Sequence, residues 1–199
     1  MKVFNRFLTL ALISVSSSLN AASTIQQEKQ QVLAVAKKYA ESTACATTFD
    51  KDTPAQERTN LQDVFLDSRD TELGEATYYV LWGGDIGCLG GSGTFYMMLS
   101  VVSRWSDYRP FLVTTASIFD QEDLGGTEAG QINSRFIESV AMVQPNVIEV
   151  VSWNFADTKY GGKDEDGTIP ANKFRYIMRF DTQNGKWKVV QQTLLEQNK

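Results

Sequence analysis

The chain contains no histidine among its 199 residues. Without an imidazole it can build neither a Ser-His-Asp or Cys-His nucleophile system nor a zinc site with histidine ligands. It also lacks an apolar run of the roughly 20 residues that a membrane-spanning helix needs. Hydrophobic residues make up 42% and charged residues 22% of the chain, which excludes disorder and collagen-like repeats. We therefore expect one soluble domain and no histidine-dependent enzyme.

The first residues predict a secretory signal peptide over residues 1–22. Lys2 and Arg6 precede a short apolar run over residues 7–15, and small residues follow. The sequence therefore predicts export to the bacterial periplasm or medium, with a mature domain of residues 23–199. Cleavage changes the formal net charge from −5 to −7, because it removes two bases and no acid. We expect no nucleic acid partner, no transmembrane anchor in the mature protein, and a basic periplasmic or extracellular protein as the partner.

Cys45 and Cys88 are the only cysteines. An exported chain with an even number of cysteines usually oxidises them, so we expect a disulfide between Cys45 and Cys88. Such a bond stabilises the fold by about 4 kcal/mol in the chain-entropy model. Two buried free thiols are the alternative. No pattern in the sequence indicates a cofactor.

Helical spacing predicts one amphipathic helix over residues 24–43 that covers one face of a sheet. Thr24 and Gln27 resemble a capping box at its start. The apolar positions that repeat at this spacing are Val32, Val35, Ala36, Tyr39 and Ala40. The polar segment 46–75 predicts a loop with a short helix or an edge strand at its apolar patch, residues 64–66.

From Thr77 on, alternating and continuous apolar runs predict strands. They are expected at residues 77–82, 94–104, 110–118, 135–143, 147–155, 173–180 and 186–193. Asn184 and Gly185 predict a tight turn with positive φ angles, and Pro145 marks another turn. Because the turns are short and no crossover helix lies between strands, the fold class is α+β and mainly β. It should be an antiparallel meander sheet or sandwich with one N-terminal amphipathic helix.

The segment 82–93 has six glycines in twelve residues. It lacks the Gly-Lys-Ser/Thr of a P-loop and the Gly-x-Ser-x-Gly of a nucleophile elbow. We interpret it as a loop between two strands that the disulfide holds, with a ligand or partner loop as the functional alternative. The candidate binding residues are Trp82, Asp85, Gly90, Gly91, Ser92 and Gly93.

Acidic residues suggest two further hypotheses. Residues 164–167 resemble the first half of a calcium loop, but position 175 holds arginine where that loop requires glutamate, so a solvated acidic loop is the alternative. Asp85 is the one acid whose surroundings look unusual. Together with an aromatic platform it would suit a carbohydrate-binding or carbohydrate-active module. The aromatic residues on predicted strands are otherwise expected to pack in the core.

Several short motifs resemble the LppP/LprE group of bacterial exported domains and lipoproteins. They are Gly90-Gly91-Ser92-Gly93-Thr94-Phe95-Tyr96, Phe136-Ile137-Glu138-Ser139-Val140, Val147-Ile148-Glu149-Val150 and Phe174-Arg175-Tyr176. The chain lacks the lipid-bearing cysteine of that group and has Phe119-Asp120-Gln121 where the group has Gly-Asp-Arg. The resemblance implies an envelope location and a β-rich fold, and it assigns no catalytic residue.

Export, acidity, a disulfide and the absence of histidine together predict a function. We expect a non-enzymatic envelope protein that binds another macromolecule, such as a cationic hydrolase or toxin that it inhibits. The carbohydrate-binding or carbohydrate-active module is the alternative.

Overall fold

The computed structural model describes residues 13–91, 93–121, 124–126, 130–164 and 169–198. In these residues the helix α1 (Ile13–Thr43) precedes the strands and four short 3-10 helices. The strands are β1 (Ala44–Thr47), β2 (Val64–Arg69), β3 (Ala76–Ile86), β4 (Phe95–Arg104), β5 (Leu112–Thr115), β6 (Ile137–Gln144), β7 (Val147–Asn154), β8 (Asn172–Asp181) and β9 (Lys186–Gln197). The predicted mainly β fold with one N-terminal helix is confirmed.

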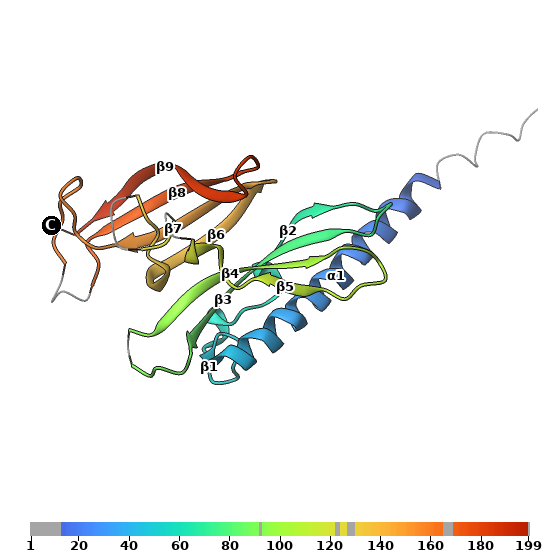
Figure 1. Ribbon diagram of the computed structural model, residues 1–199, viewed down its shortest axis with the longest axis horizontal. Coiled ribbons are helices and arrows are strands. Elements are labelled where there is room, and N and C mark those ends of the chain that lie inside the picture. The colour runs from blue at the N-terminus through green and yellow to red at the C-terminus, as the bar shows by residue number, and fades with distance from the viewer. Residues whose placement is uncertain (1–12, 92, 122–123, 127–129, 165–168, 199) are drawn as a thin grey trace, which may run out of the picture.

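The strands form two antiparallel sheets (Figure 1). In the first sheet β2, β3, β4 and β5 are consecutive neighbours. β1 pairs with the last residues of β3, on the edge that β2 occupies further back. The second sheet has the order β6-β7-β8-β9. Each sheet is thus a meander, as the short turns predict.

Side-chain alternation assigns the two faces of the first sheet to different neighbours. α1 covers one face, where Val32 and Ala36 pack against Tyr78, Val80 and other buried side chains. The second sheet packs against the opposite face, and their joint core is the largest of the buried clusters. Its members include Tyr79 and Leu99 from the first sheet and Val150, Phe174, Tyr176, Met178 and Trp187 from the second. The order of layers is therefore helix, sheet, sheet.

α1 ends at Thr43, as predicted, but it begins at Ile13 instead of residue 24. The capping-box prediction at Thr24 was wrong, because Thr24 lies inside the helix. The helix is continuous there, since residues 13–43 contain no proline or glycine that would interrupt it. At the other end the Thr43 hydroxyl donates to the Tyr39 carbonyl at 2.9 Å. Residues 1–12 lie outside the described residues, and cleavage of residues 1–22 stays a prediction. In the described ranges no helix has both the length and the apolarity to cross a membrane.

All seven predicted strands are present, and the edge-strand alternative at residues 64–66 is confirmed as β2. β1 was not predicted, because its four residues show no alternation. The turn between β8 and β9 differs from the prediction: Gly185 has φ 66°, but Asn184 is not in the positive-φ region. Instead the Asn184 side chain donates to the Asp181 carboxylate at 2.6 Å. The connection is therefore a longer loop than a two-residue turn.

Candidate functional site

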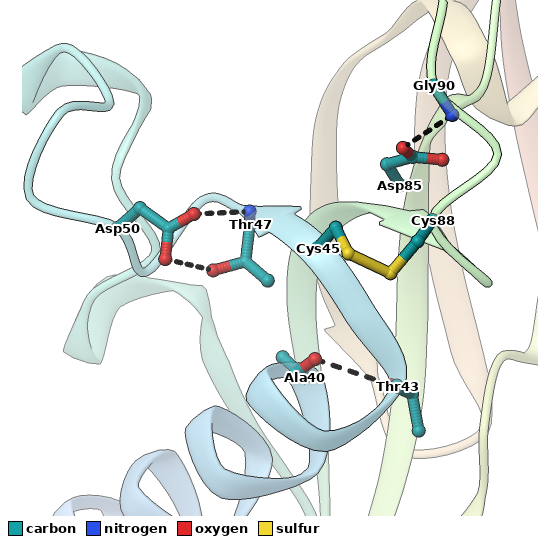
Figure 2. The surroundings of a disulfide bond; sticks show 8 residues. All are labelled: Ala40, Thr43, Cys45, Thr47, Asp50, Asp85, Cys88 and Gly90. Carbon is teal, nitrogen blue, oxygen red and sulfur yellow. Dashed lines mark hydrogen bonds between the residues drawn. A yellow bond between two sulfur atoms is a disulfide. The ribbon is translucent and has the colours of Figure 1, made fainter.

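The Cys45–Cys88 disulfide is present, with an S–S distance of 2.02 Å and a Cα–Cα distance of 5.0 Å (Figure 2). Cys45 lies on β1, directly after α1, and Cys88 lies just beyond β3. Next to it, the Asp50 carboxylate accepts hydrogen bonds from the N–H and the hydroxyl of Thr47 at 2.7 and 3.0 Å. The disulfide therefore fixes the end of the β3–β4 hairpin to the end of the helix.

The predicted loop begins later than the sequence indicates, because Trp82 to Ile86 belong to β3. Gly83 and Gly84 are needed there for close packing. A Cβ atom on Gly83 would lie 2.5 Å from Cε1 of Phe95, and one on Gly84 would lie 2.9 Å from the Trp82 ring. A glycine-rich run thus marks a close approach of neighbouring side chains to a strand. Residues 87–94 make the connection to β4, and Ser92 lies outside the described residues.

Two of the candidate binding residues have buried side chains. Trp82 is completely buried, and its Nε1 donates to the Ser100 hydroxyl at 2.8 Å, so it is part of the core. Asp85 is 9% exposed. One of its carboxylate oxygens accepts the Gly90 N–H at 3.1 Å, while the other has no hydrogen-bond partner within the described residues (Figure 2). Asp85 therefore holds the loop and does not face solvent.

The remaining candidate glycines differ in their surroundings. A Cβ atom on Gly91 would meet nothing within 4 Å, so this position faces open space. A Cβ atom on Gly93 would lie 3.3 Å from Nη2 of Arg135, which places the loop next to the segment before β6. The loop backbone is therefore accessible at Gly91, which is compatible with the predicted partner loop.

Large apolar side chains are exposed around this loop. They are Ile86, Leu89, Phe95 and Tyr96, with exposed fractions of 39%, 76%, 39% and 39%. The register of β3 and β4 places Ile86 and Tyr96 on the α1 side of the sheet and Phe95 on the opposite side. These residues lie on both sides of the hairpin end, and we call them the hairpin-end patch. The sequence analysis expected the strand aromatics, Phe95 and Tyr96 included, to be mostly core residues. Alternation shows which residues share a face, but it does not show how far the neighbouring layer extends over that face. The exposure of these two aromatics was therefore not predictable.

A cavity of about 480 Å³ lies beside the patch at the edge of β4, and we call it the edge cavity. Its lining includes Ile86 and Tyr96 of the patch, Tyr39 of α1, and Ala116, Phe119 and Asp120 from the segment after β5. Desolvation by burial raises the pKa of Asp120. The cavity therefore combines apolar walls with the carboxylate of Asp120, a residue that is exposed to solvent.

A second recess, of about 630 Å³, lies beside Phe95 and is called the acidic groove. Its lining combines the apolar side chains of Leu81, Phe95 and Met97 with the carboxylates of Glu57, Asp63 and Glu138. Burial raises the pKa of Asp63, against the hydrogen bond from the Asn60 N–H. The ion pair with Lys173, at 2.6 Å, lowers the pKa of Glu138.

Arg58 also lines the acidic groove, but its guanidinium is engaged. It donates to the carbonyl of Thr53 at 2.7 Å and to the carbonyl of Lys51. Carbonyl oxygens do not neutralise the guanidinium, and Lys173 neutralises Glu138, so Glu57 and Asp63 against Arg58 leave this groove with one negative charge in excess. This small excess favours a positively charged ligand group.

The most connected carboxylate of the described residues was missed in the sequence analysis. Glu28 of α1 is 4% exposed. It pairs with Arg69 of β2 through two contacts of 3.1 and 3.2 Å, with Arg104 of β4 at 2.9 Å, and accepts the Tyr78 hydroxyl of β3 at 2.7 Å. Burial by itself would raise the pKa of Glu28, but these hydrogen bonds outweigh it and the pKa is lowered.

This Glu28 cluster lies at the end of β3 away from the hairpin-end patch, because Arg69 and Arg104 both pair with Ala76, the first residue of β3, and Tyr78 follows two residues later. A sequence signal existed: Glu28 lies four residues before Val32 and eight before Ala36, on the buried side of the helix. The cluster joins α1 to three strands, and it is a structural element of the first sheet.

The calcium hypothesis concerns residues 164–167, of which 165–167 lie outside the described residues. Asp164 accepts the Ala156 N–H at 2.8 Å, and Asp157 accepts the N–H groups of Lys159 and Tyr160. Among the residues that the structure describes, no three acidic or cysteine side chains gather as a metal site would require. Calcium binding at this loop stays a hypothesis from the sequence.

Comparison of the chain with protein-family models, with curated proteins and with solved structures finds no match. The resemblance to the LppP/LprE group therefore stays a prediction, and the function is argued from the site alone.

Proposed function

We propose that this protein is a non-enzymatic binding protein of the bacterial envelope, which holds a basic protein partner at the end of the β3–β4 hairpin. The observation that carries the proposal is the hairpin-end patch, four exposed apolar side chains on a hairpin that a disulfide fixes. Exposed apolar patches with a polar rim are typical of protein interaction sites. A rigid loop also loses little conformational entropy on binding.

The charge of the partner is inferred from the acidic groove next to the patch. Glu57, Asp63 and Glu138 line it, and one negative charge remains after Glu138 pairs with Lys173 and Arg58 offsets one of the other two carboxylates. The formal net charge of −5 has the same sign. Charge complementarity of this kind accelerates association and selects partners, and it weakens with salt. A basic hydrolase or toxin that this protein inhibits fits these requirements.

The carbohydrate alternative receives less support from the site. It depends on Asp85 as a group that meets the sugar, and this carboxylate is buried beneath the loop and bonded to the Gly90 N–H. Trp82, the tryptophan next to it, is completely buried and offers no stacking surface.

Affinity capture with oxidised protein from an envelope extract of the host bacterium tests the proposal. Leu89→Asp places a charge in the patch, and Leu73→Asp is the matched control, because Leu73 is 61% exposed in the β2–β3 turn. We expect the wild type and Leu73→Asp to retain the same basic protein, less at high salt, and Leu89→Asp to retain about tenfold less. Capture of nothing, or equal capture by both variants, would overturn the proposal.

A further inference from the structure

Part of the outer edge of β4 has no strand partner. β5 pairs with β4 only over Val101, Val102 and Ser103. Before that point the Leu99 N–H points away from β3, since it donates to the Ser117 hydroxyl at 3.4 Å. Backbone groups alternate in direction along a strand, so the N–H and C=O of Met97 and Phe95 point to the same outer edge. No strand of the described residues pairs with them.

An open strand edge selects the kind of ligand that it binds. Its unpaired N–H and C=O groups match those of another extended backbone, which can add to the sheet as a further strand. The edge cavity lies directly beside this edge, because Tyr96, Met97 and Met98 of β4 line it. Successive side chains of an added strand would alternate between the two faces of the sheet, and those on the α1 side would meet this cavity.

The cavity also indicates which side chain enters it. Tyr39 and Phe119 offer apolar contacts for an aliphatic stem, and Asp120 supplies a carboxylate. A lysine or arginine side chain combines such a stem with a cationic end. The positive charge of such a side chain is complementary to the carboxylate of Asp120. The acidic groove on the other side of Phe95 also favours a basic partner.

We propose that the open edge of β4 takes up an extended segment of the partner as an added strand, with a lysine or arginine side chain in the edge cavity. This proposal rests on the proposed function, whose partner contact it specifies. A separate extended segment is favoured over a second copy of this chain, because the open edge covers only Phe95 to Met97, and the next outward N–H, that of Leu99, is already bonded to Ser117. It lies between the segment that follows β5 and Ser134, both of which line the cavity.

Titration with the synthetic peptide acetyl-Lys-Val-Lys-Val-Lys-Val-Lys-amide tests the added strand. A peptide with proline in place of valine has the same charge but lacks alternate N–H donors, and a peptide with glutamate in place of lysine reverses the charge. We expect the Lys-Val peptide alone to bind, and to slow hydrogen exchange of the Met97 amide about tenfold. Equal binding of the Lys-Pro peptide, or no protection at Met97, would overturn the added strand.

Ala116→Trp fills the cavity from an exposed position, and Val190→Trp on β9, where the side chain is 55% exposed, is the matched control. We expect Ala116→Trp to weaken peptide binding at least about tenfold and Val190→Trp to leave it unchanged. Asp120→Asn should weaken it severalfold. Equal affinity of all three variants would exclude the edge cavity as the binding site.

The capture experiment separates this proposal from the proposed function. If Leu89→Asp loses the captured partner and Ala116→Trp keeps it, the function stands and the added strand is wrong. If both variants lose it and the peptide protects Met97, both proposals are supported. Sedimentation that shows a dimer, which Ala116→Trp dissociates, would identify a second copy as the occupant and overturn the partner segment.

Discussion

Two buried carboxylates lie at opposite ends of β3 and have opposite surroundings. Glu28, at one end, has both oxygens engaged, with two arginines and a tyrosine hydroxyl. Asp85, at the other end, has one oxygen on the Gly90 N–H and one with no partner among the described residues. Around Glu28 four secondary-structure elements converge. Around Asp85 apolar side chains are exposed, and two recesses open.

This difference separates the parts of the first sheet that serve stability from those that are available for binding. A buried charge is tolerated when its partners are complete, and removal of one member then leaves the others unpaired. Incompletely packed ends with exposed apolar side chains are typical of interaction sites. We therefore expect substitutions at the Glu28 end to lower stability, and substitutions at the hairpin end to affect mainly binding.

Glu28→Gln should have the largest effect on stability. It removes the charge that both Arg69 and Arg104 face, so the free energy of unfolding should fall by about 4 kcal/mol. Glu41→Gln is the matched control on the same helix, because its ion pair with Lys37 is half exposed and should contribute less than about 0.5 kcal/mol. Urea unfolding measures both. Equal losses would show that the buried ion pairs of Glu28 stabilise the fold no more than the exposed Lys37–Glu41 pair does.

The same stabilisation should depend on pH. Because the pKa of Glu28 in the folded state lies below its ordinary value of 4.5, its contribution is fully present above pH 4.5 and is lost as the pH falls through the folded pKa. The difference in unfolding free energy between the wild type and Glu28→Gln should therefore narrow below pH 4.5. Unfolding curves between pH 7 and pH 3 measure it, and a constant difference over this range would contradict the assignment.

Removal of the disulfide should weaken the other end of the sheet. Cys45→Ser with Cys88→Ser should lower the free energy of unfolding by about 3 kcal/mol, since the unfolded chain gains freedom and disulfides typically contribute somewhat less than the chain-entropy model gives. Amide exchange should accelerate in β1, which the disulfide holds, and remain slow around Tyr78. If exchange accelerates equally at both ends, the two ends are one cooperative unit and the comparison fails.

Local patterns were sufficient for most of the fold. Alternation located seven strands, helical spacing located the end of α1, and the number of cysteines in a chain predicted to be exported indicated the disulfide. The start of α1 was not predictable from Thr24, since a capping residue also fits inside a continuous helix. β1 was missed because its four residues, Ala44–Thr47, form a strand only through their pairing with β3.

The candidate site was less predictable, because it depends on contacts between distant residues. Arg69 and Arg104 lie 41 and 76 residues from Glu28, so no local motif could join them. Asp85 was singled out because of its glycine neighbours, which suggested an exposed loop. Gly83 and Gly84 are instead strand residues under neighbouring side chains. The exposure of Phe95 depends on how far the second sheet extends over the first, and no local sequence pattern predicts that extent.

Gly83→Ala tests the close packing at the hairpin end. The added Cβ would lie 2.5 Å from Phe95 and 2.8 Å from Sδ of Met97. Because the Phe95 ring is partly exposed and can move, we expect a loss of about 1 kcal/mol. Gly93→Ala is the matched control, because its Cβ would meet only the movable end of Arg135, at 3.3 Å. Thermal unfolding compares them. A larger loss of stability in Gly93→Ala than in Gly83→Ala would mean that the loop at Gly93 is packed more tightly than the strand at Gly83.

Asp85→Asn should have the smallest effect and sharpens the contrast with Glu28. The asparagine oxygen can still accept the Gly90 N–H, and no cation of the described residues pairs with this carboxylate, so the free energy of unfolding should change by less than about 1 kcal/mol. Asp85→Ala, which leaves the Gly90 N–H without its acceptor, should cost more. A loss in Asp85→Asn as large as that in Glu28→Gln would show that Asp85 has a charged partner, and that both ends of β3 are held by ion pairs.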